Sequence, residues 1–382
     1  MQITFKNLSR PKLDQKISAG LKKNPPGFFD LPKSDSREIL RFAKSCKNKQ
    51  ILIIGIGGSS LPARTLIDFG KQTQREFYFL ENVDPTEAQR IFRQIDFKKV
   101  LVLVVSKSGG TLETLANFFV VKKLLGQNWS KQTVFLTDPK KGFLYDLAQK
   151  EKVRTFAIPE NVGGRFSIFT PVGLLPAALA GIDLQKLLQG AQKTDPKKAL
   201  EFAQMQAQEF KRGKNIAVFC VYLNQLESLS KWFEQILAES IGKNSKVGIT
   251  PAPAIGAIDQ HSKLQLWTSG PNDKFYIFAG VQKFERDFKI PQPPAELSFL
   301  KNKSLGQILR AEFLATSQSL VEKKRPIALF DFEKIGPAEL GEFLQFWMLE
   351  VYFLAQILQV NFADQPGVER GKILAKKRLA RN

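Results

Sequence analysis

Runs of apolar residues alternate along the chain with segments whose apolar residues recur at helical spacing. The apolar run at 51–54 is followed by the helix-like LPARTLIDF, and the run at 100–106 is followed by TLETLANFFVVKKLL. Further strand-like runs lie at 77–82, 133–137 and 153–158. Near-continuous apolar strands interleaved with helices are typical of a parallel sheet that is covered on both faces. The pattern therefore predicts a layered α/β domain over roughly residues 40–182.

A second cycle begins after the polar stretch QKTDPKK, where Asp195 and Pro196 predict a turn or linker. Strand-like runs at 215–222, 274–280 and 325–332 accompany the helix-like QLESLSKWFEQILAESIGK and LQFWMLEVYFLAQIL, and GVERGKILAKKRLARN predicts a basic C-terminal helix. The expected fold class is α/β, with two domains that each hold a mainly parallel sheet between helices. The expected boundaries are 1–39 for an N-terminal extension, 40–195 and 196–360 for the two domains, and 361–382 for a C-terminal loop and helix.

Composition favours a globular protein. The chain has 382 residues, of which 43% are hydrophobic and 11% aromatic, enough for two domains with their own cores. No apolar stretch is long enough to span a bilayer, and the opening MQITFKNLSRPKLDQK lacks the apolar core of a signal peptide. Cys46 and Cys220 are the only cysteines and lie far apart, which argues against a disulfide framework or a cysteine metal site. We therefore expect a cytoplasmic protein.

The formal net charge of +21 has two interpretations: a surface that binds a polyanion, or a generally basic protein whose acidic partners are small phosphates. The densest basic run comprises Arg370, Lys372, Lys376, Lys377, Arg378 and Arg381. No aromatic residues interleave with this run, as a stacking platform for single strands would need, and no zinc-finger or basic-zipper spacing is present. We expect a solvated basic surface, with no specific nucleic-acid partner and no membrane.

The string VVSKSGGTLET, residues 104–114, joins an apolar strand to a helix start. It supplies the hydroxyls of Ser106, Ser108 and Thr111 and the amides around Gly109 and Gly110. Many donors, little steric bulk and the positive end of a helix together suit a phosphate group.

The string GIGGSS, residues 55–60, is built in the same way, with Ser59 and Ser60 at a predicted helix N-cap and Pro62 in the first turn. Either string alone is equally typical of an ordinary strand-to-helix turn. Two such turns, each at the carboxyl end of a strand, favour a ligand site, because open α/β sheets bind ligands there. Neither string has the spacing of a dinucleotide fingerprint or the Lys-Ser/Thr of a P-loop.

Three further segments carry candidate acid–base or charge-stabilising groups. Gln235 and Glu239 are four residues apart, on one face of a predicted helix that ends just after Glu239. Arg165 follows two glycines, and a guanidinium there can stabilise developing oxyanion charge. Lys372 lies in DQPGVERGK. Each has a plainer alternative: a solvated helix glutamate, a surface ion pair and a solvated basic tail.

His261 is the only histidine, and imidazole is the side chain whose ordinary pKa lies near neutrality. Its neighbours Asp259, Gln260 and Ser262 can all orient an imidazole or a bound polyol. The alternative is a structural histidine with satisfied hydrogen bonds.

Taken jointly, these segments resemble the phosphoglucose isomerase family. The matching strings, in the family's order, are GIGGSS, SKSGGTLET, PENVGGRFSIFTPVGLLPAALAGID, QILAESIGK, DQHSKLQ and DQPGVERGK. The resemblance runs from about residue 50 to the C-terminus. It implies two sugar-isomerase (SIS) domains, and a homodimer in which the active site is completed across the subunit boundary.

The resemblance also implies a reaction: reversible isomerisation of glucose 6-phosphate and fructose 6-phosphate through ring opening and a cis-enediolate, with no metal or cofactor. It implies that Glu239 shuttles a proton between C2 and C1 of the open-chain sugar and that Arg165 stabilises the enediolate. It assigns His261 and Lys372 to ring opening. The residues it implies for substrate binding are Gly58, Ser59, Ser106, Lys107, Ser108, Thr111, Gln235 and Gln365.

The chain departs from the family pattern without losing a matched catalytic residue. GIGGSS continues as SLPAR where a leucine-glycine pair is usual, and Ser269 stands where an acidic residue is common. Three other functions stay open: an isomerase that also accepts mannose 6-phosphate, a non-catalytic SIS-domain sensor, and a polyanion-binding module. The sensor predicts a phosphate site without the set Glu239, His261 and Lys372, and the module predicts steeply salt-dependent affinity for nucleic acid.

Overall fold

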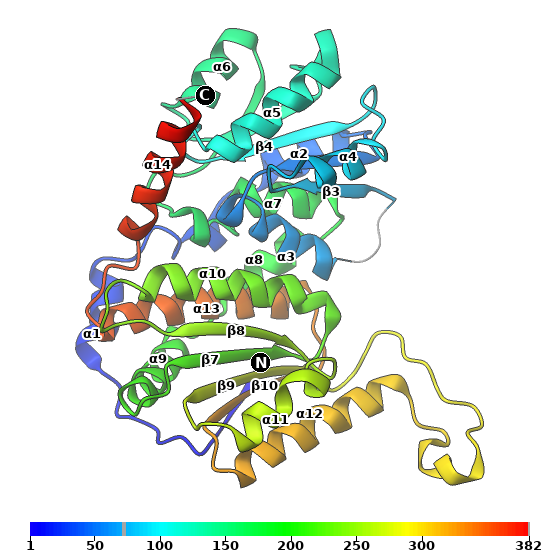
Figure 1. The fold of residues 1–382 in the computed structure, drawn as a ribbon, viewed down its shortest axis with the longest axis vertical. Helices are drawn as coiled ribbons and strands as arrows, with labels where there is room; N and C mark the ends of the chain where they lie inside the picture. Colours follow the sequence, from blue (N-terminus) through cyan, green and yellow to red (C-terminus); the bar gives the residue numbers. More distant parts are fainter. Residues whose placement is uncertain (71–73, 381–382) are drawn as a thin grey trace. The chain divides into compact units, whose positions relative to one another are not determined.

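The computed structural model describes residues 1–70 and 74–380, so Arg381, in the predicted C-terminal helix, lies outside the described residues. The chain forms two compact units, each built around its own five-stranded sheet (Figure 1). Unit I comprises Pro25–Gln192 and Gln225–Trp232, and unit II comprises Met1–Asn24, Lys193–Asn224 and Phe233–Asn382.

All strands of unit I run parallel, in the order β3-β2-β4-β5-β6. The strands are β2 (Gln50–Ile54), β3 (Glu76–Leu80), β4 (Leu101–Ser106), β5 (Thr133–Thr137) and β6 (Arg154–Ala157). The helices are α2 (Arg37–Ser45), α3 (Leu61–Phe69), α4 (Pro85–Phe92), α5 (Leu112–Leu125), α6 (Phe143–Glu151), α7 (Pro171–Leu179) and α8 (Leu184–Gln192).

The strands β2 and β4 lie at the centre of this sheet because they are apolar on both faces. Every residue of β4 is buried, and in β2 the side chains of residues 51–54 are fully buried. The chain places β3 on one side of β2 and then returns to place β4 on the other side. Such a reversal opens a crevice at the carboxyl ends of the two strands, where open α/β sheets bind ligands.

The sheet of unit II has the order β1-β10-β9-β7-β8, and all strands except β1 run parallel. The strands are β1 (Gln2–Lys6), β7 (Ile216–Val221), β8 (Thr250–Ile255), β9 (Lys274–Val281) and β10 (Ile327–Phe332). The helices are α1 (Gln15–Lys23), α9 (Pro196–Lys211), α11 (Gln260–Ser269), α12 (Leu305–Glu322), α13 (Pro337–Ile357) and α14 (Glu369–Leu379). Helix α10 (Glu227–Ile241) begins in unit I and ends in unit II.

An aromatic cluster fixes α9, α10 and α13 on one face of the unit II sheet. Trp347 of α13 is fully buried, and its ring centroid lies 5.2 Å from that of Phe219 in β7 and 5.1 Å from that of Phe330 in β10. The same indole lies 5.4 Å from Phe202 of α9 and 4.8 Å from Phe233 of α10. Pairs of this kind add about 0.5–1.5 kcal/mol each beyond the area they bury. The cluster therefore anchors α10, whose last turn carries Glu239, against the sheet.

The predicted α/β fold class is confirmed, because each sheet is parallel or mainly parallel and has helices packed on it. The sequence does not predict β1, which pairs antiparallel with β10 from Gln2 opposite Asp331 to Lys6 opposite Ile327. Its five residues, QITFK, are too few to show a clear alternation of apolar and polar side chains. The strand forms because the edge of β10 offers unpaired backbone groups. The domain boundaries at 39, 195 and 360 stay a prediction.

Candidate functional site

The turn after β2 brings the backbones of two glycine-containing loops together. Gly57 has a φ of 57°, a conformation that favours glycine. A Cβ on Gly58 would lie 2.6 Å from the carbonyl carbon of Gly164 and 2.8 Å from the amide nitrogen of Arg165. The hydroxyl of Ser167 donates a 3.2 Å hydrogen bond to the Gly58 carbonyl. Only glycine allows this close approach at position 58.

Ser59 and Ser60 follow in the same turn. Ser59 ends the 3-10 helix η2 (Gly57–Ser59), and its amide donates to the Ile56 carbonyl at 3.1 Å. Ser60 occupies the predicted N-cap position of α3, but its hydroxyl donates to the Gly57 carbonyl at 3.3 Å and does not cap the helix. Pro62 lies in the first turn of α3, as predicted.

The turn after β4 is held by contacts among its own hydroxyls and amides. The Oγ of Ser106 lies 2.9 Å from the Oγ1 of Thr111, which stands at the N-cap of α5. Gly109 has a φ of 67°, and the Gly110 amide donates to the Ser108 Oγ at 3.3 Å. Ser106 is buried, whereas Ser108 and Gly110 are exposed beside the positive end of α5. This is the arrangement of donors that a phosphate group needs.

Lys107 ties this turn to the loop that precedes Arg165. Its ammonium donates 2.7 Å hydrogen bonds to the carbonyls of Glu160 and Val162. An ammonium has three N–H donors, so one donor remains for a ligand. Burial lowers the pKa of Lys107, an effect that the charges of Asp138 and Glu160 oppose.

Arg165 lies in the 3-10 helix η4 (Gly164–Phe166) and is only 5% exposed. Its guanidinium carbon lies 5.7 Å from the centre of the Phe166 ring. Helix η2 packs on η4, so Arg165 belongs to the same edge of unit I as the two turns. Unit I thus brings together the predicted residues Gly58, Ser59, Ser106, Lys107, Ser108, Thr111 and Arg165.

Unit II holds a second group of predicted residues at the C-terminal end of α10. Gln235 and Glu239 are both half-buried, and the Gln235 Nε2 donates a 2.9 Å hydrogen bond to the Glu239 Oε1. This bond orients one carboxylate oxygen of Glu239. The second oxygen of a carboxylate is the more basic one when the first accepts a hydrogen bond, which is the arrangement that a positioned general base requires.

Lys243, just beyond α10, makes a contact with Asp364 that the sequence does not predict. Its ammonium donates to the backbone carbonyl of Asp364 and lies 3.1 Å from the Asp364 carboxylate, and its side chain is 9% exposed. This pair holds the loop that carries Gln365 against the end of α10. Lys372 lies beyond this loop in α14, exposed and 2.7 Å from the carboxylate of Glu369. Lys243 and Asp364 fall inside two of the matched strings, QILAESIGK and DQPGVERGK. Their place in these strings is the sequence signal that could have marked them as candidate site residues.

His261 lies at the opposite edge of the unit II sheet. Helix α10 follows the carboxyl end of β7 and runs back along the sheet (Figure 1), so Glu239 lies near the edge where β8 begins. His261 is the second residue of α11, which begins shortly after the carboxyl end of β8. Strand β8 has six residues, so the two edges are roughly 20 Å apart. The structure therefore does not bring Glu239 and His261 of unit II together.

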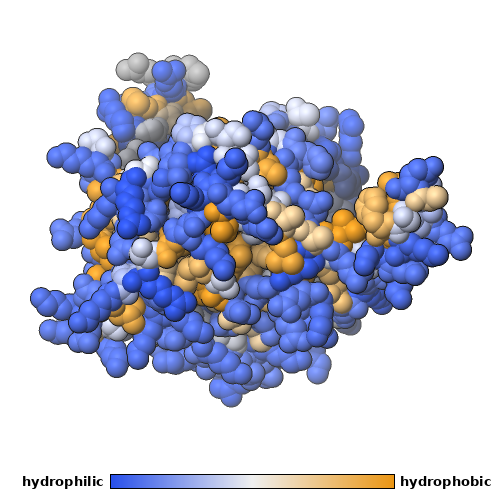
Figure 2. Space-filling view, turned by 90° about the horizontal axis from the view of Figure 1, so that it is seen from below, coloured by the Kyte–Doolittle hydropathy of each residue, from blue (hydrophilic) through white to orange (hydrophobic). Residues whose placement is uncertain are grey.

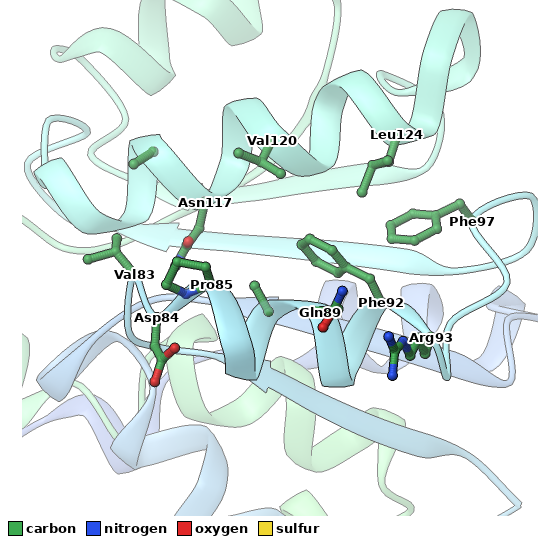
Figure 3. Close-up of a pocket in the computed structure, with 12 residues that line it drawn as sticks. Val83, Asp84, Pro85, Gln89, Phe92, Arg93, Phe97, Asn117, Val120 and Leu124 are labelled. Carbon is green, nitrogen blue, oxygen red and sulfur yellow. The ribbon is translucent and has the colours of Figure 1, made fainter.

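The apolar groove of unit I in Figure 3 is a separate feature. It has a volume of about 720 Å³ and lies between α4 and α5. Its walls are mostly apolar and include Phe92, Phe97, Val120 and Leu124. Among the described residues that line it, none is a predicted site residue. This groove therefore does not include the two turns, where the donors at the ends of β2 and β4 form the candidate site.

Two negative findings apply to the described part of the chain. No helix within residues 1–70 and 74–380 is long and apolar enough to cross a membrane. No group of three or more histidine, cysteine, aspartate or glutamate side chains in those residues could hold a metal ion.

Two mainly parallel sheets between helices, with Ser- and Gly-rich turns at the carboxyl ends of two neighbouring strands, define a protein of the sugar-isomerase (SIS) fold. The solved C-terminal domain of glucosamine-fructose-6-phosphate aminotransferase from Francisella tularensis shares this fold with a TM-score of 0.56. Residues 43–250 match the family described as phosphoglucose isomerase. The chain belongs to the phosphoglucose isomerase family.

Individual relatives agree with this assignment. The glucose-6-phosphate isomerase of Carboxydothermus hydrogenoformans is 37% identical over 385 residues, which cover 91% of this chain and 83% of that protein. The glucose-6-phosphate isomerase of Thermus thermophilus is 38% identical over 373 residues, covering 93% of this chain and 90% of that protein. The crystal structure of a hypothetical protein from Thermus thermophilus matches with a TM-score of 0.88 at 36% identity, over 96% of this chain and 93% of that one.

Proposed function

We propose that this chain interconverts glucose 6-phosphate and fructose 6-phosphate, as the names of its relatives state for them, and that it serves glycolysis and gluconeogenesis in the cytoplasm. The observation that carries the proposal is the set of donors at one edge of unit I, where Lys107 links the SKSGG turn to the loop of Arg165. A sugar phosphate is the ligand whose charge and size suit these donors. Specific nucleic-acid binding forms no part of the proposal.

The phosphate and the neighbouring hydroxyls are held by the two turns. Ser106, Ser108 and Thr111 supply hydroxyls, Lys107 supplies a positive charge, and the turn at Gly58 and Ser59 supplies backbone donors near the sugar. Binding of the non-reacting phosphate supplies the energy that positions C1 and C2.

Glu239 acts on the open-chain sugar. Its carboxylate takes the proton from C2 of the aldose, the electron pair forms the C1–C2 double bond, and the carbonyl oxygen becomes the enediolate oxygen. Arg165 stabilises that negative charge. The C2 hydroxyl proton then passes to the C1 oxygen, Glu239 returns its proton to C1, and an electron pair on the C2 oxygen forms the C2 carbonyl of the ketose. Gln235 donates to one Glu239 oxygen and so orients the carboxylate. Gln365 contributes to substrate binding.

His261 and Lys372 assist ring opening. One group donates a proton to the ring oxygen while the other removes the proton from the C1 hydroxyl, so the C1–O5 bond breaks and the aldehyde forms. Proton transfers of this kind typically contribute about 10²–10⁴-fold in rate.

We further propose that the protein is a homodimer with a shared active site. Glu239 and His261 lie at opposite edges of one sheet, so a site that uses both needs His261 from a second copy. Exposed apolar side chains near His261 support such a contact: Ile258 is 62% exposed and Leu266 is 52% exposed. Figure 2, which views the molecule from below, shows a mostly hydrophilic face that is interrupted by apolar patches.

The proposed function is tested with Glu239→Gln, which keeps the shape of the side chain and removes the base. In an assay of fructose 6-phosphate turnover, kcat falls by about 10³-fold or more, within the range for loss of a positioned base, while KM changes little. Glu234→Gln, at an exposed position five residues earlier in α10, is the matched control and keeps wild-type activity. Full activity in Glu239→Gln, or an inactive wild type, would contradict the proposal, and the second result would favour a sensor.

A further inference from the structure

The side chain of Gln260 is held at both ends. The Oη of Tyr222 donates a 2.9 Å hydrogen bond to the Gln260 Oε1, and the Gln260 Nε2 donates a 2.8 Å hydrogen bond to the Oε2 of Glu312. Tyr222 directly follows β7, and Glu312 lies on α12. Gln260 is the first residue of α11, and His261 is the second. Two other elements of unit II therefore fix the start of the helix that carries His261.

The polarity of these bonds leaves Gln260 a single orientation. A phenol can donate to the amide oxygen, whereas a carboxylate can only accept from the amide nitrogen. Burial raises the pKa of Tyr222, so its Oη keeps the proton that it donates at neutral pH. An exchanged amide would place its oxygen against the Glu312 carboxylate and lose that bond. The geometry thus distinguishes the two ends of the amide.

The two anchors are themselves rigid. Tyr222 is 1% exposed, and its ring packs edge-on against Phe313 at 5.1 Å. Gly256 lies directly against this ring, because a Cβ there would come within 2.4 Å of the Tyr222 Cζ. Phe313 is the residue after Glu312 on α12, so one packing contact locates both anchors.

The backbone before α11 is tied down as well. The Asp259 Oδ2 accepts the Ile255 amide at 2.8 Å, and the Ser262 hydroxyl donates to the Asp259 Oδ1 at 3.0 Å. Asp259 fixes the turn itself, but these bonds do not reach the neighbouring elements α12 and β7. Gln260 supplies that link.

We infer that Gln260, held between Tyr222 and Glu312, is the positioning residue that sets the imidazole of His261 for ring opening. This inference rests on the proposed function of His261. Gln260 does not touch the sugar in this account, and it acts by fixing the first turn of α11. A misplacement of about 1 Å at a reacting group can cost on the order of 10²-fold in rate, so a clamp on the adjacent residue has a measurable effect.

The experiment measures ring opening directly, as the enzyme-catalysed exchange between the α and β anomers of glucose 6-phosphate above its spontaneous rate, followed by NMR. Gln260→Leu, which removes both hydrogen bonds, is expected to slow this exchange by about 10–100-fold. Tyr222→Phe, which removes one donor and keeps the ring, is expected to slow it by a smaller factor. Gln265→Leu, at an exposed position on the same helix, is the control and leaves the exchange unchanged.

A double-mutant cycle separates positioning from general damage. If Gln260 acts only through His261, then Gln260→Leu added to His261→Ala causes no further loss of anomer exchange, although it slows exchange in the wild-type background. An equal loss in both backgrounds, or no loss in the wild-type background, would overturn the inference. Thermal unfolding of each variant identifies a misfolded Gln260→Leu, and in that case Tyr222→Phe carries the cycle.

The same data distinguish this inference from the proposed function. If His261→Ala alone leaves anomer exchange unchanged, the ring-opening role of His261 is wrong whatever Gln260 does. If His261→Ala slows the exchange and both clamp variants exchange at the wild-type rate, only the inference about Gln260 is wrong.

Discussion

Four strands of each sheet share one order, and the two sheets differ in the turns at the ends of these equivalent strands. In unit I, β3 and β4 flank β2, and in unit II, β8 and β9 flank β7 in the same way. The turns after β2 and β4 are GIGGSS and SKSGG, whereas β7 is followed by Tyr222 and β9 by Gln282. Only unit I therefore has small residues and many donors at the crevice. The comparison indicates that strand order creates the place for a ligand, and that the turn sequence decides whether a phosphate fits there.

In unit II, Glu239 lies away from the equivalent crevice, whereas His261 lies on the side of the sheet where β7 and β8 end. Glu239 lies at the end of α10, and His261 lies at the start of α11, at opposite edges of the sheet. Loss of small turn residues should therefore harm unit I and spare unit II. The effect of removing a charged side chain from unit II should depend on which of the two edges of the sheet that side chain occupies.

The largest expected effect in this comparison is that of Gly58→Ala. The added Cβ would overlap the Gly164 and Arg165 backbone, so the two loops must separate. We expect destabilisation of about 1–3 kcal/mol, typical of overpacking, and a loss of kcat/KM on the order of 10²-fold. Thermal unfolding and steady-state kinetics measure the two effects. Asn224→Ala, in the equivalent turn of unit II and exposed, is the matched control and should change neither. Equal effects in the two turns would remove the distinction between the units.

An intermediate effect is expected for Lys107→Met, which removes the charge and both hydrogen bonds to the Arg165 loop. We expect KM for fructose 6-phosphate to rise by about 10-fold or more, in line with loss of a charged contact of about 1.5–3 kcal/mol. The matched control is Lys141→Met. Lys141 also reaches Glu160, but through an exposed ion pair of 3.3 Å with its carboxylate, and such pairs contribute little. If both variants raise KM alike, Lys107 acts through general surface charge.

The smallest expected effect is the loss of stability in Asp259→Asn. In the turn between β8 and α11 of unit II, the Asp259 carboxylate, and not a glycine, holds the backbone. Burial acts to raise the pKa of Asp259, but hydrogen bonds from the Ile255 amide, Ser262 and Lys263 outweigh it and lower the pKa. A lowered pKa means that the stabilisation is fully present above the ordinary aspartate value of about 3.9 and is lost as the pH falls through the folded-state pKa.

At pH 7 we therefore expect Asp259→Asn to lower the Tm by a few degrees, roughly the effect of 1 kcal/mol. The difference from wild type should shrink as the pH falls below about 4. Melting curves at several pH values test this. A Tm difference that stays constant down to about pH 3 would show that the ionised carboxylate is not the stabilising form.

Much of unit I could be predicted from the sequence because its signals are local. Buried strands such as β4 are continuous apolar runs, and the turn after β4 shows its donors in consecutive residues. The contacts of unit II are not local. The Lys243–Asp364 pair joins residues 121 positions apart, and the Gln260–Glu312 bond joins residues 52 apart. The sequence shows the residues in these pairs, but only the folded chain brings the partners together.

The edge strand β1 was unpredictable for a related reason. Its five residues show no clear alternation of apolar and polar side chains, and the backbone groups of β1 find their hydrogen-bond partners in β10. The predicted capping bond of Ser60 is also absent, because the Ser60 hydroxyl donates its hydrogen bond to the Gly57 carbonyl instead.

The central proposal is that Glu239 and His261, which lie at opposite edges of the unit II sheet, meet only across two copies of the chain. Its most direct test mixes two inactive variants, Glu239→Gln and His261→Ala, after the subunits have been dissociated and allowed to reassociate. In a mixed dimer, the site that keeps Glu239 receives an intact His261 from the partner, so an equal mixture should regain about a quarter of wild-type sites. A mixture that stays as inactive as its components, with mixed dimers verified, would contradict the shared site.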